Sequence, residues 1–274
     1  MSDEPSFPLH ALARRCLDCT DVAGKLASTA EAARRFAAGE LAADIGEAPR
    51  TELGGLQPGR PLRPALVAAR ALAQRGLGSP EGRAALVHAV AHIEFNAINL
   101  AWDAVWRFRG MPAAFYADWV GVAADEARHF AMLSARLAEL GHAYGDFDAH
   151  DGLWDMAVRT ADACLARMAL VPRVLEARGL DVTPGMITRL RSVGDDATAC
   201  ILEVILAEEV AHVAAGSRWF SWCCEREGLA PESEFRRLID LHMRGSLRGP
   251  FNRDARLRAG FSVAELRSLD EIAA

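Results

Sequence analysis

Two segments of the chain carry a glutamate and a histidine three residues apart. The first pair is Glu126 and His129, and the second is Glu209 and His212. Residues three apart lie on the same face of a helix, so each pair presents a carboxylate and an imidazole together. One such motif is weak evidence because short motifs recur by chance. Two of them in separate long segments point more firmly to a metal ion held by oxygen and nitrogen ligands.

A single glutamate precedes each motif by almost the same distance. Glu94 lies 32 positions before Glu126, and Glu176 lies 33 positions before Glu209. A duplicated pair of helices, each giving one glutamate and one Glu-x-x-His motif, accounts for this spacing. The set matches that of ferritin-like di-iron and di-manganese proteins. We therefore expect six metal ligands: Glu94, Glu126, His129, Glu176, Glu209 and His212.

The charges of such a set balance. Two divalent ions carry four positive charges, four carboxylates neutralise them, and two neutral imidazoles complete the ligands. We expect Glu126 and Glu209 to bridge the ions, while each motif histidine joins the single glutamate of its own helix pair. Oxygen-rich ligation favours iron, or else manganese, over zinc.

Three of these glutamates interrupt apolar helix faces. Glu126 falls in a stripe running from Trp119 to Leu137, and Glu94 and Glu209 interrupt similar stripes. A carboxylate on a core-facing stripe is costly unless it is paired, protonated or bound to metal. The alternative, surface residues tied into salt bridges, requires all three positions to be coincidental.

Glu176 is the least secure of the six ligands. It lies near the end of its expected helix, and its stripe is less cleanly apolar. Pro172 stands four residues earlier, and a kink there would turn Glu176 inward. If Glu176 is not a ligand, Glu203 is the substitute, although it lies on another face of its helix.

The elements that must position these residues are almost all helical, since apolar residues recur at three- and four-residue intervals. The four long helices expected are 79–109, 113–140, 152–178 and 195–227. Gly179 and Gly228 are expected to end the last two, and Thr183-Pro184 to open a short helix. One or two helices are expected in 7–43, a loop over 46–64, and a short helix from Pro231.

This pattern predicts an all-α protein: a ferritin-like four-helix bundle with extra N-terminal helices and a C-terminal helical extension. The expected divisions are 1–78 for the N-terminal helices and loop, 79–230 for the bundle, and 231–274 for the extension.

Composition excludes several classes of protein. The 274 residues are 51% hydrophobic and 25% charged, which is typical of a globular chain rather than a disordered one. A net charge of -6 provides no general basic field for nucleic acid. We expect no secretion signal and no membrane span. Six scattered cysteines fit a reducing compartment, so we expect a cytoplasmic protein.

Several residues beside the expected ligands have two interpretations. His88 and His92 are favoured as structural histidines, with contact to a ligand or to substrate as the alternative for His92. Asp125 and Glu208 each precede a motif glutamate. Hydrogen bonding to ligand histidines and exposed ion pairing are equally supported for these two acids.

The C-terminal tail is rich in arginine. Five arginines and one acid lie between residues 244 and 260. Arg248 and Arg253 could bind a phosphate, a nucleotide or an RNA backbone. We favour a structural role, in which these arginines pair with the acidic bundle, because apolar residues flank them.

Longer runs carry a family resemblance. They are His92-Ile93-Glu94, Asp125 to His129, Tyr144 to Trp154, Leu170 to Asp181, and Arg248 to Asn252. Together they resemble the bacterial ferritin-like proteins filed as domain of unknown function 455, over about residues 60 to 265. The resemblance implies a di-iron fold and no settled activity. More distantly, the chain resembles the di-iron tRNA hydroxylase that acts on modified adenosine.

Three functions remain open at this point, because a bundle does not determine a reaction. The first is an O2-dependent oxidase or oxygenase with two iron ions, acting on a small molecule or modified nucleoside with electrons from a donor protein. The second is iron handling by a ferroxidase. The third, ranked low, is a radical-generating or manganese–peroxide site. A homodimer is compatible with each.

Overall fold

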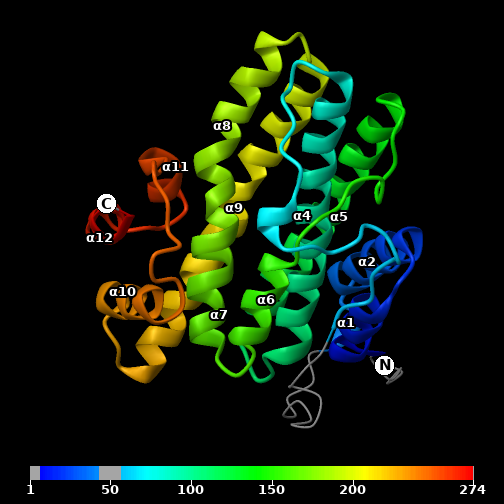
Figure 1. Cartoon of the computed structure of the whole chain (residues 1–274). Coiled ribbons are helices and arrows are strands. Elements are labelled where there is room, and N and C mark those ends of the chain that lie inside the picture. Colours follow the sequence, from blue (N-terminus) through cyan, green and yellow to red (C-terminus); the bar gives the residue numbers. More distant parts are fainter. Residues whose placement is uncertain (1–6, 43–56, 274) are drawn as a thin grey trace. The chain divides into compact units, whose positions relative to one another are not determined.

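The computed structural model describes residues 7–42 and 57–273, and these are overwhelmingly helical. The strands within this range are β1 (Phe7–Pro8) and β2 (Leu41–Ala42), which pair in parallel. The prediction of an all-α protein is confirmed (Figure 1). The chain forms two compact units, residues 1–158 and residues 159–274. The three-part division stays a prediction, as does most of the expected loop 46–64, whose residues up to 56 lie outside the described range.

The first unit is built around a helical hairpin of α4 (Pro80–Arg107) and α5 (Ala113–Glu139). Ser79 begins α4 by accepting a hydrogen bond from the amide of Gly82 at 3.0 Å, and Pro80 needs no such partner. Gly141 follows α5 with a φ of 78°, a conformation that glycine adopts readily. The expected bounds of both helices are therefore confirmed to within about two residues.

Two N-terminal helices, α1 (Leu9–Asp18) and α2 (Val22–Ala37), pack on this hairpin, as expected for 7–43. The ring of His10 donates to the carbonyl of Val105 at 2.8 Å. The indole of Trp102 donates to Thr29 at 2.9 Å. These contacts enclose the second half of α4, where side chains are buried on every face.

The enclosure of α4 also bears on the membrane question. Of the described residues, only this helix has the length and mean hydropathy, 1.2, that a membrane span would need. However, 72% of its apolar window is buried inside the protein. This burial is the behaviour of a core helix.

The second unit pairs the long helix α9 (Asp196–Glu227) with a run of three consecutive helical segments: α7 (Cys164–Leu170), the π-helix η2 (Val171–Glu176) and α8 (Ala177–Ser192). Asp195 caps α9 by accepting from the amide of Thr198 at 3.1 Å, and Gly228 ends it with a φ of 67°. The bounds expected for 195–227 are confirmed.

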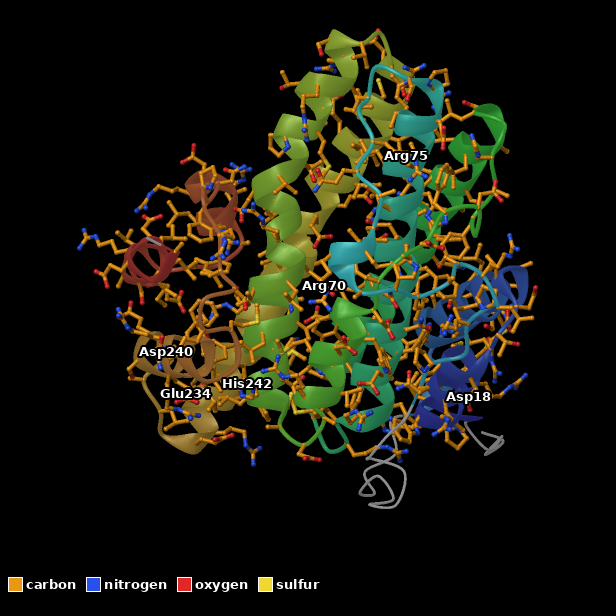
Figure 2. All side chains as sticks on the ribbon, viewed as in Figure 1. Asp18, Arg70, Arg75, Glu234, Asp240 and His242 are labelled. Atoms are coloured by element: carbon orange, nitrogen blue, oxygen red, sulfur yellow. The ribbon has the colours of Figure 1, made fainter. Side chains whose placement is uncertain are left out.

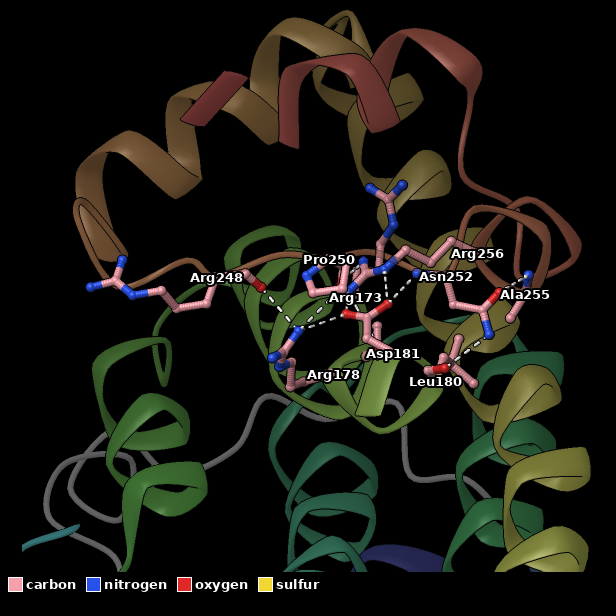
Figure 3. Close-up of polar contacts among 10 residues, drawn as sticks. Arg173, Arg178, Leu180, Asp181, Arg248, Pro250, Asn252, Ala255 and Arg256 are labelled. Atoms are coloured by element: carbon pink, nitrogen blue, oxygen red, sulfur yellow. Dashed lines mark hydrogen bonds and ion pairs between the residues drawn. The ribbon is translucent and has the colours of Figure 1, made fainter. Parts of the chain in front are cut away.

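The single helix expected over 152–178 is wrong. A short helix, α6 (Gly152–Arg159), stops before α7 begins, and α8 runs on through Gly179 and Pro184. Pro184 has no amide hydrogen, so it leaves the carbonyl of Leu180 without its helical partner. The side chain of Asn252 donates to that carbonyl at 3.0 Å, as Figure 3 shows. Gly179 and Pro184 are local signals that would end the helix, but a hydrogen bond from a residue 72 positions away supports α8 through this region.

The expected kink at Pro172 takes the form of the π-helix. Pro172 lies in its first turn, and a Cβ added to Gly216 of α9 would lie only 2.5 Å from the Pro172 ring. Gly216 thus permits a close approach of η2 to α9. Single π turns within α-helices often mark functional sites.

Three further helices, α10 (Pro231–His242), α11 (Arg253–Arg258) and α12 (Val263–Ala273), complete the second unit. The guanidinium of Arg173 is buried, and its central carbon lies 4.3 to 4.7 Å from the ring centres of three phenylalanines: Phe220 of α9, Phe235 of α10, and Phe261 between α11 and α12. Some ion pairs are local: the buried Glu234 contacts the exposed Arg237 at 2.6 Å in the second unit, and Arg75 contacts Glu81 at 3.2 Å in the first (Figure 2 labels Glu234 and Arg75).

Candidate metal centre

The first unit brings together three of the predicted ligands. Glu94 comes from α4, and Glu126 and His129 come from adjacent turns of α5. The Nδ1 atom of His129 lies 3.1 Å from Glu94 and 3.5 Å from Glu126. All three residues are buried, with exposed fractions of 5%, 3% and 0% respectively. Because each sits on the apolar stripe of its helix, packing of the hairpin buries them together.

Electrostatics at this set favours a cation. Burial raises the pKa of Glu94 well above its usual range, and the nearby carboxyl of Glu126 raises it further. Burial alone would lower the pKa of His129, but hydrogen bonds to Glu126 and Glu94 outweigh this effect and raise it to about 10. The group therefore binds protons tightly without a metal. A divalent ion would supply the positive charge that these protons supply.

The second unit brings together the second motif. The Nδ1 atom of His212 lies 3.2 Å from a carboxylate oxygen of Glu209, and His212 is buried while Glu209 is slightly more exposed. Glu176 is the last residue of η2 and is half-buried. Gly179, one turn further along, faces Glu209: a Cβ added there would lie 4.0 Å from its Cγ. The absence of a side chain at Gly179 leaves room for Glu209.

The donor atoms fit the ion expected from the sequence. One atom each from Glu94, Glu126 and His129 lies within 4.8 Å of the others, which is close enough for all three to ligate one ion. Two carboxylates and one imidazole per ion form the oxygen-rich mixture that iron and manganese accept.

His92 makes its contacts away from this set. Its Nδ1 lies 2.9 Å from the hydroxyl of Tyr144, and its Nε2 lies 3.0 Å from the amide of Asn96 and 3.2 Å from the carbonyl of His150. Burial lowers the pKa of His92 to about 4, so the ring is neutral. His88 accepts from the amide of Gly145 at 2.9 Å. Both histidines thus hold the loop after α5 against α4.

The remaining acidic candidates are more exposed. Asp125 pairs with Arg128 at 2.9 Å on the outside of α5. Glu208 is half-buried on α9. Glu203, the substitute for Glu176, is exposed and pairs with Arg191 at 2.7 Å.

The arginines of the tail fall into two groups. Arg253 forms an exposed ion pair with Asp270 at 2.7 Å. Arg256 is buried and pairs with Asp181 through two hydrogen bonds, of 2.9 and 2.8 Å. Arg248 is exposed and donates to carbonyls of its own loop.

Sequence reasoning did not place two residues, Tyr144 and Lys25, against Phe95, which is next to Glu94. The ring of Tyr144 lies 5.0 Å from that of Phe130 and 5.5 Å from that of Phe95, the neighbours of His129 and Glu94. Its position in a loop gave no periodic signal. Lys25 is fully buried and donates to Cys16, Leu17 and Asn99, and burial lowers its pKa to about 8. The one signal available for it is that the chain has no other lysine.

Comparison with known proteins places the chain in a family. Residues 18–267 match the family described as "Protein of unknown function (DUF455)", and the chain belongs to it. An uncharacterised protein of Haemophilus influenzae is 44% identical over 219 residues, which cover 77% of this chain and 76% of that protein. No solved structure matches.

Proposed function

We propose that this protein is a ferritin-like di-iron carboxylate protein that uses O2 to oxidise or oxygenate a small organic substrate. The observation that carries the proposal is the buried set of Glu94, Glu126 and His129. Its second support is the sequence repeat, which gives the other unit the matching residues Glu209 and His212. Manganese is the alternative metal.

The residues of the chain would act mainly by holding the metal and excluding water. Glu94, Glu126 and His129 would bind one ion, and Glu176, Glu209 and His212 would bind the other. Two ferrous ions, when bound, supply electrons for reducing O2. On binding metal, Glu94 and His129 would give up their protons.

The surroundings of the first set suit a reactive oxidant. Phe95 and Phe130 flank Glu94 and His129 and are almost fully buried, so they keep bulk water away from the carboxylates. The hydroxyl of Tyr144 is held by His92 at 2.9 Å, which fixes the phenol ring against both phenylalanines. We further propose a cytoplasmic location, an electron-donor protein as partner, and no membrane association.

The reaction with O2 tests this function against iron storage. Purified protein would be loaded anaerobically with Fe(II), exposed to O2, and followed by absorption and Mössbauer spectroscopy. An oxygenase or oxidase centre should react once per pair of iron ions and then stop. Continued oxidation of added Fe(II) with growth of a mineral core would instead establish a ferroxidase and overturn the proposal.

The control for this reaction is Glu139→Gln. Glu139 lies on α5 like Glu126 but is exposed and pairs with Arg136 at 2.7 Å. This variant should react as the wild type does, whereas Glu126→Ala should lose the spectroscopic change. A reaction that survives in Glu126→Ala would exclude this carboxylate from the site.

A further inference from the structure

The second unit contains a cavity lined by four arginines. Its volume is about 220 Å³, and it lies among η2, the start of α8, the segment 243–251 and α12. The described residues that line it include no carboxylate. The arginines are Arg173, Arg178, Arg248 and Arg256, and Figure 3 shows the last three with the carboxylate of Asp181.

The charges around this cavity are not balanced. Arg256 is neutralised by Asp181, and Arg173 by Glu265 at 2.8 Å. Arg178 reaches the same Asp181 at 3.5 Å and otherwise donates to main-chain carbonyls. The Arg248 side chain donates to the main-chain carbonyls of Gly245 and Leu247. Four guanidinium groups therefore face two carboxylates, an excess of two positive charges.

One donor at the cavity is also buried without an acceptor. Arg173 donates from Nε to Ser217 at 3.1 Å and from Nη2 to Glu265, but its Nη1 is buried and has no hydrogen-bond partner. An unmade hydrogen bond from a buried charged group is costly. A ligand that brings acceptor oxygens to Arg173 would remove this cost.

We propose that this cavity binds the phosphate group of a small phosphorylated molecule. A phosphate monoester carries close to two negative charges at neutral pH, which matches the excess. Arginine is suited to phosphate because its planar fork presents paired donors to two oxygens. Apolar side chains such as Leu247, Phe251 and Leu269 complete the walls and leave room for a small organic substituent. This site is separate from the candidate metal ligands and does not depend on them.

Binding of inorganic phosphate to the full-length protein is the direct test. Titration at low ionic strength, followed by calorimetry and by ³¹P NMR, should show saturable binding of one phosphate per chain. Arg248→Gln should weaken it by about tenfold or more, since one charge-assisted contact is lost. The Arg248 side chain donates to carbonyls of its own loop, and its main-chain carbonyl, which accepts from Arg178, stays in place, so this variant should fold, which circular dichroism would check.

The matched control is Arg253→Gln. It removes the same charge from the same tail, but Arg253 is paired with Asp270 and does not line the cavity. The affinity of the Arg253→Gln protein for phosphate should stay within about twofold of the wild-type value, because a surface charge is screened by salt. No saturable binding, or equal weakening in both variants, would overturn the proposal.

Competition with a short oligoribonucleotide distinguishes a small phosphorylated molecule from an RNA backbone as the ligand of this cavity. If the cavity serves a small molecule, inorganic phosphate should compete with the oligonucleotide poorly or not at all, and Arg248→Gln should leave any oligonucleotide binding unchanged. Oligonucleotide binding that is lost in Arg248→Gln and displaced by phosphate would overturn the small-molecule assignment in favour of an RNA backbone.

Discussion

At the scale of residues, the proposed chemistry of the protein depends on a few buried polar side chains. Glu94 and Glu126 lie in the core of the first unit, where an ionised carboxylate is costly without a cation. The imidazole of His129 contacts both carboxylates, at 3.1 Å from Glu94 and 3.5 Å from Glu126. The burial of Glu94 and Glu126 was predictable because each interrupts an apolar stripe, and His129 was predictable from its spacing of three residues from Glu126. The packing of Tyr144 against Phe95 and Phe130 was not predictable, because a loop has no helical periodicity from which its contacts follow.

Replacing Glu94 with glutamine should remove metal but leave the fold. The amide has the same shape as the carboxylate and no charge, so it relieves the cost of burial while losing a ligand. We expect Glu94→Gln to retain about one ion fewer per chain than the wild type. Metal analysis after equilibration with Fe(II) measures this, and equal occupancy in the two proteins would exclude Glu94 as a ligand.

The stability of the metal-free protein should fall as the pH rises. The pKa of His129 is about 10 in the folded state, against an ordinary value of 6.5, so its stabilising charge is complete below pH 6.5 and is lost on the way to pH 10. The raised pKa of Glu94 also lowers the free energy of unfolding as the pH rises, because ionisation of this buried carboxyl is unfavourable in the folded state. Urea unfolding with a chelator present should show a decrease from about pH 7 to pH 9.5.

His129→Gln provides the control for this pH dependence. It removes the titrating imidazole, so the decrease in unfolding free energy should become shallower. A metal-free wild type whose stability rises with pH would contradict the assigned protonation. So would a slope that His129→Gln leaves unchanged.

At the scale of elements, local signals determine most helix ends but fail where distant contacts intervene. The ends of α4, α5 and α9 follow from Ser79, Gly141, Asp195 and Gly228, which act within a few residues. The extent of α8 could not be predicted, because the hydrogen bond that replaces the missing amide of Pro184 comes from Asn252, 72 residues beyond Leu180 in the sequence. The π turn at η2 depends in the same way on Gly216 of another helix.

Asn252→Ala should destabilise the protein through α8. The carbonyl of Leu180 would lose its donor, and α11 would lose the cap that Asn252 provides to the amide of Ala255. We expect a loss of about 1–3 kcal/mol in unfolding free energy. In a Pro184→Ala background the restored amide can reach Leu180, so the same substitution should cost about 1 kcal/mol less. Strictly additive effects in this cycle would contradict the explanation.

Gly216→Ala should separate η2 from α9. The new methyl group would meet the Pro172 ring at 2.5 Å, so one of the two helices must shift. We expect a loss of about 1–3 kcal/mol, despite the better helix propensity of alanine. Gly185→Ala is the matched control, since a Cβ at Gly185 meets nothing within 4 Å. It should be neutral or stabilising, and a similar loss in both variants would show that packing at Pro172 is not the cause.

At the scale of the whole molecule, each of the two units carries one of the two related sets of predicted metal ligands on a pair of helical segments. The first has Glu94 on α4 and its motif on α5, while the second has Glu176 on η2 and its motif on α9. A net charge of -6 counts all of these acids as free charge. Under the proposed function, two divalent ions would bring this charge to about -2, and the mild acidity of the chain would then reflect bound metal more than a partner's charge.

The metal content of the protein tests the central claim most directly. Protein loaded anaerobically with Fe(II) and freed of excess iron should hold about two ions per chain. Glu126→Ala and Glu209→Ala should each hold substantially less, while the surface variant Glu139→Gln should match the wild type. A wild type that binds almost no iron, or variants at Glu126 and Glu209 that bind as much as the wild type, would contradict the di-iron assignment.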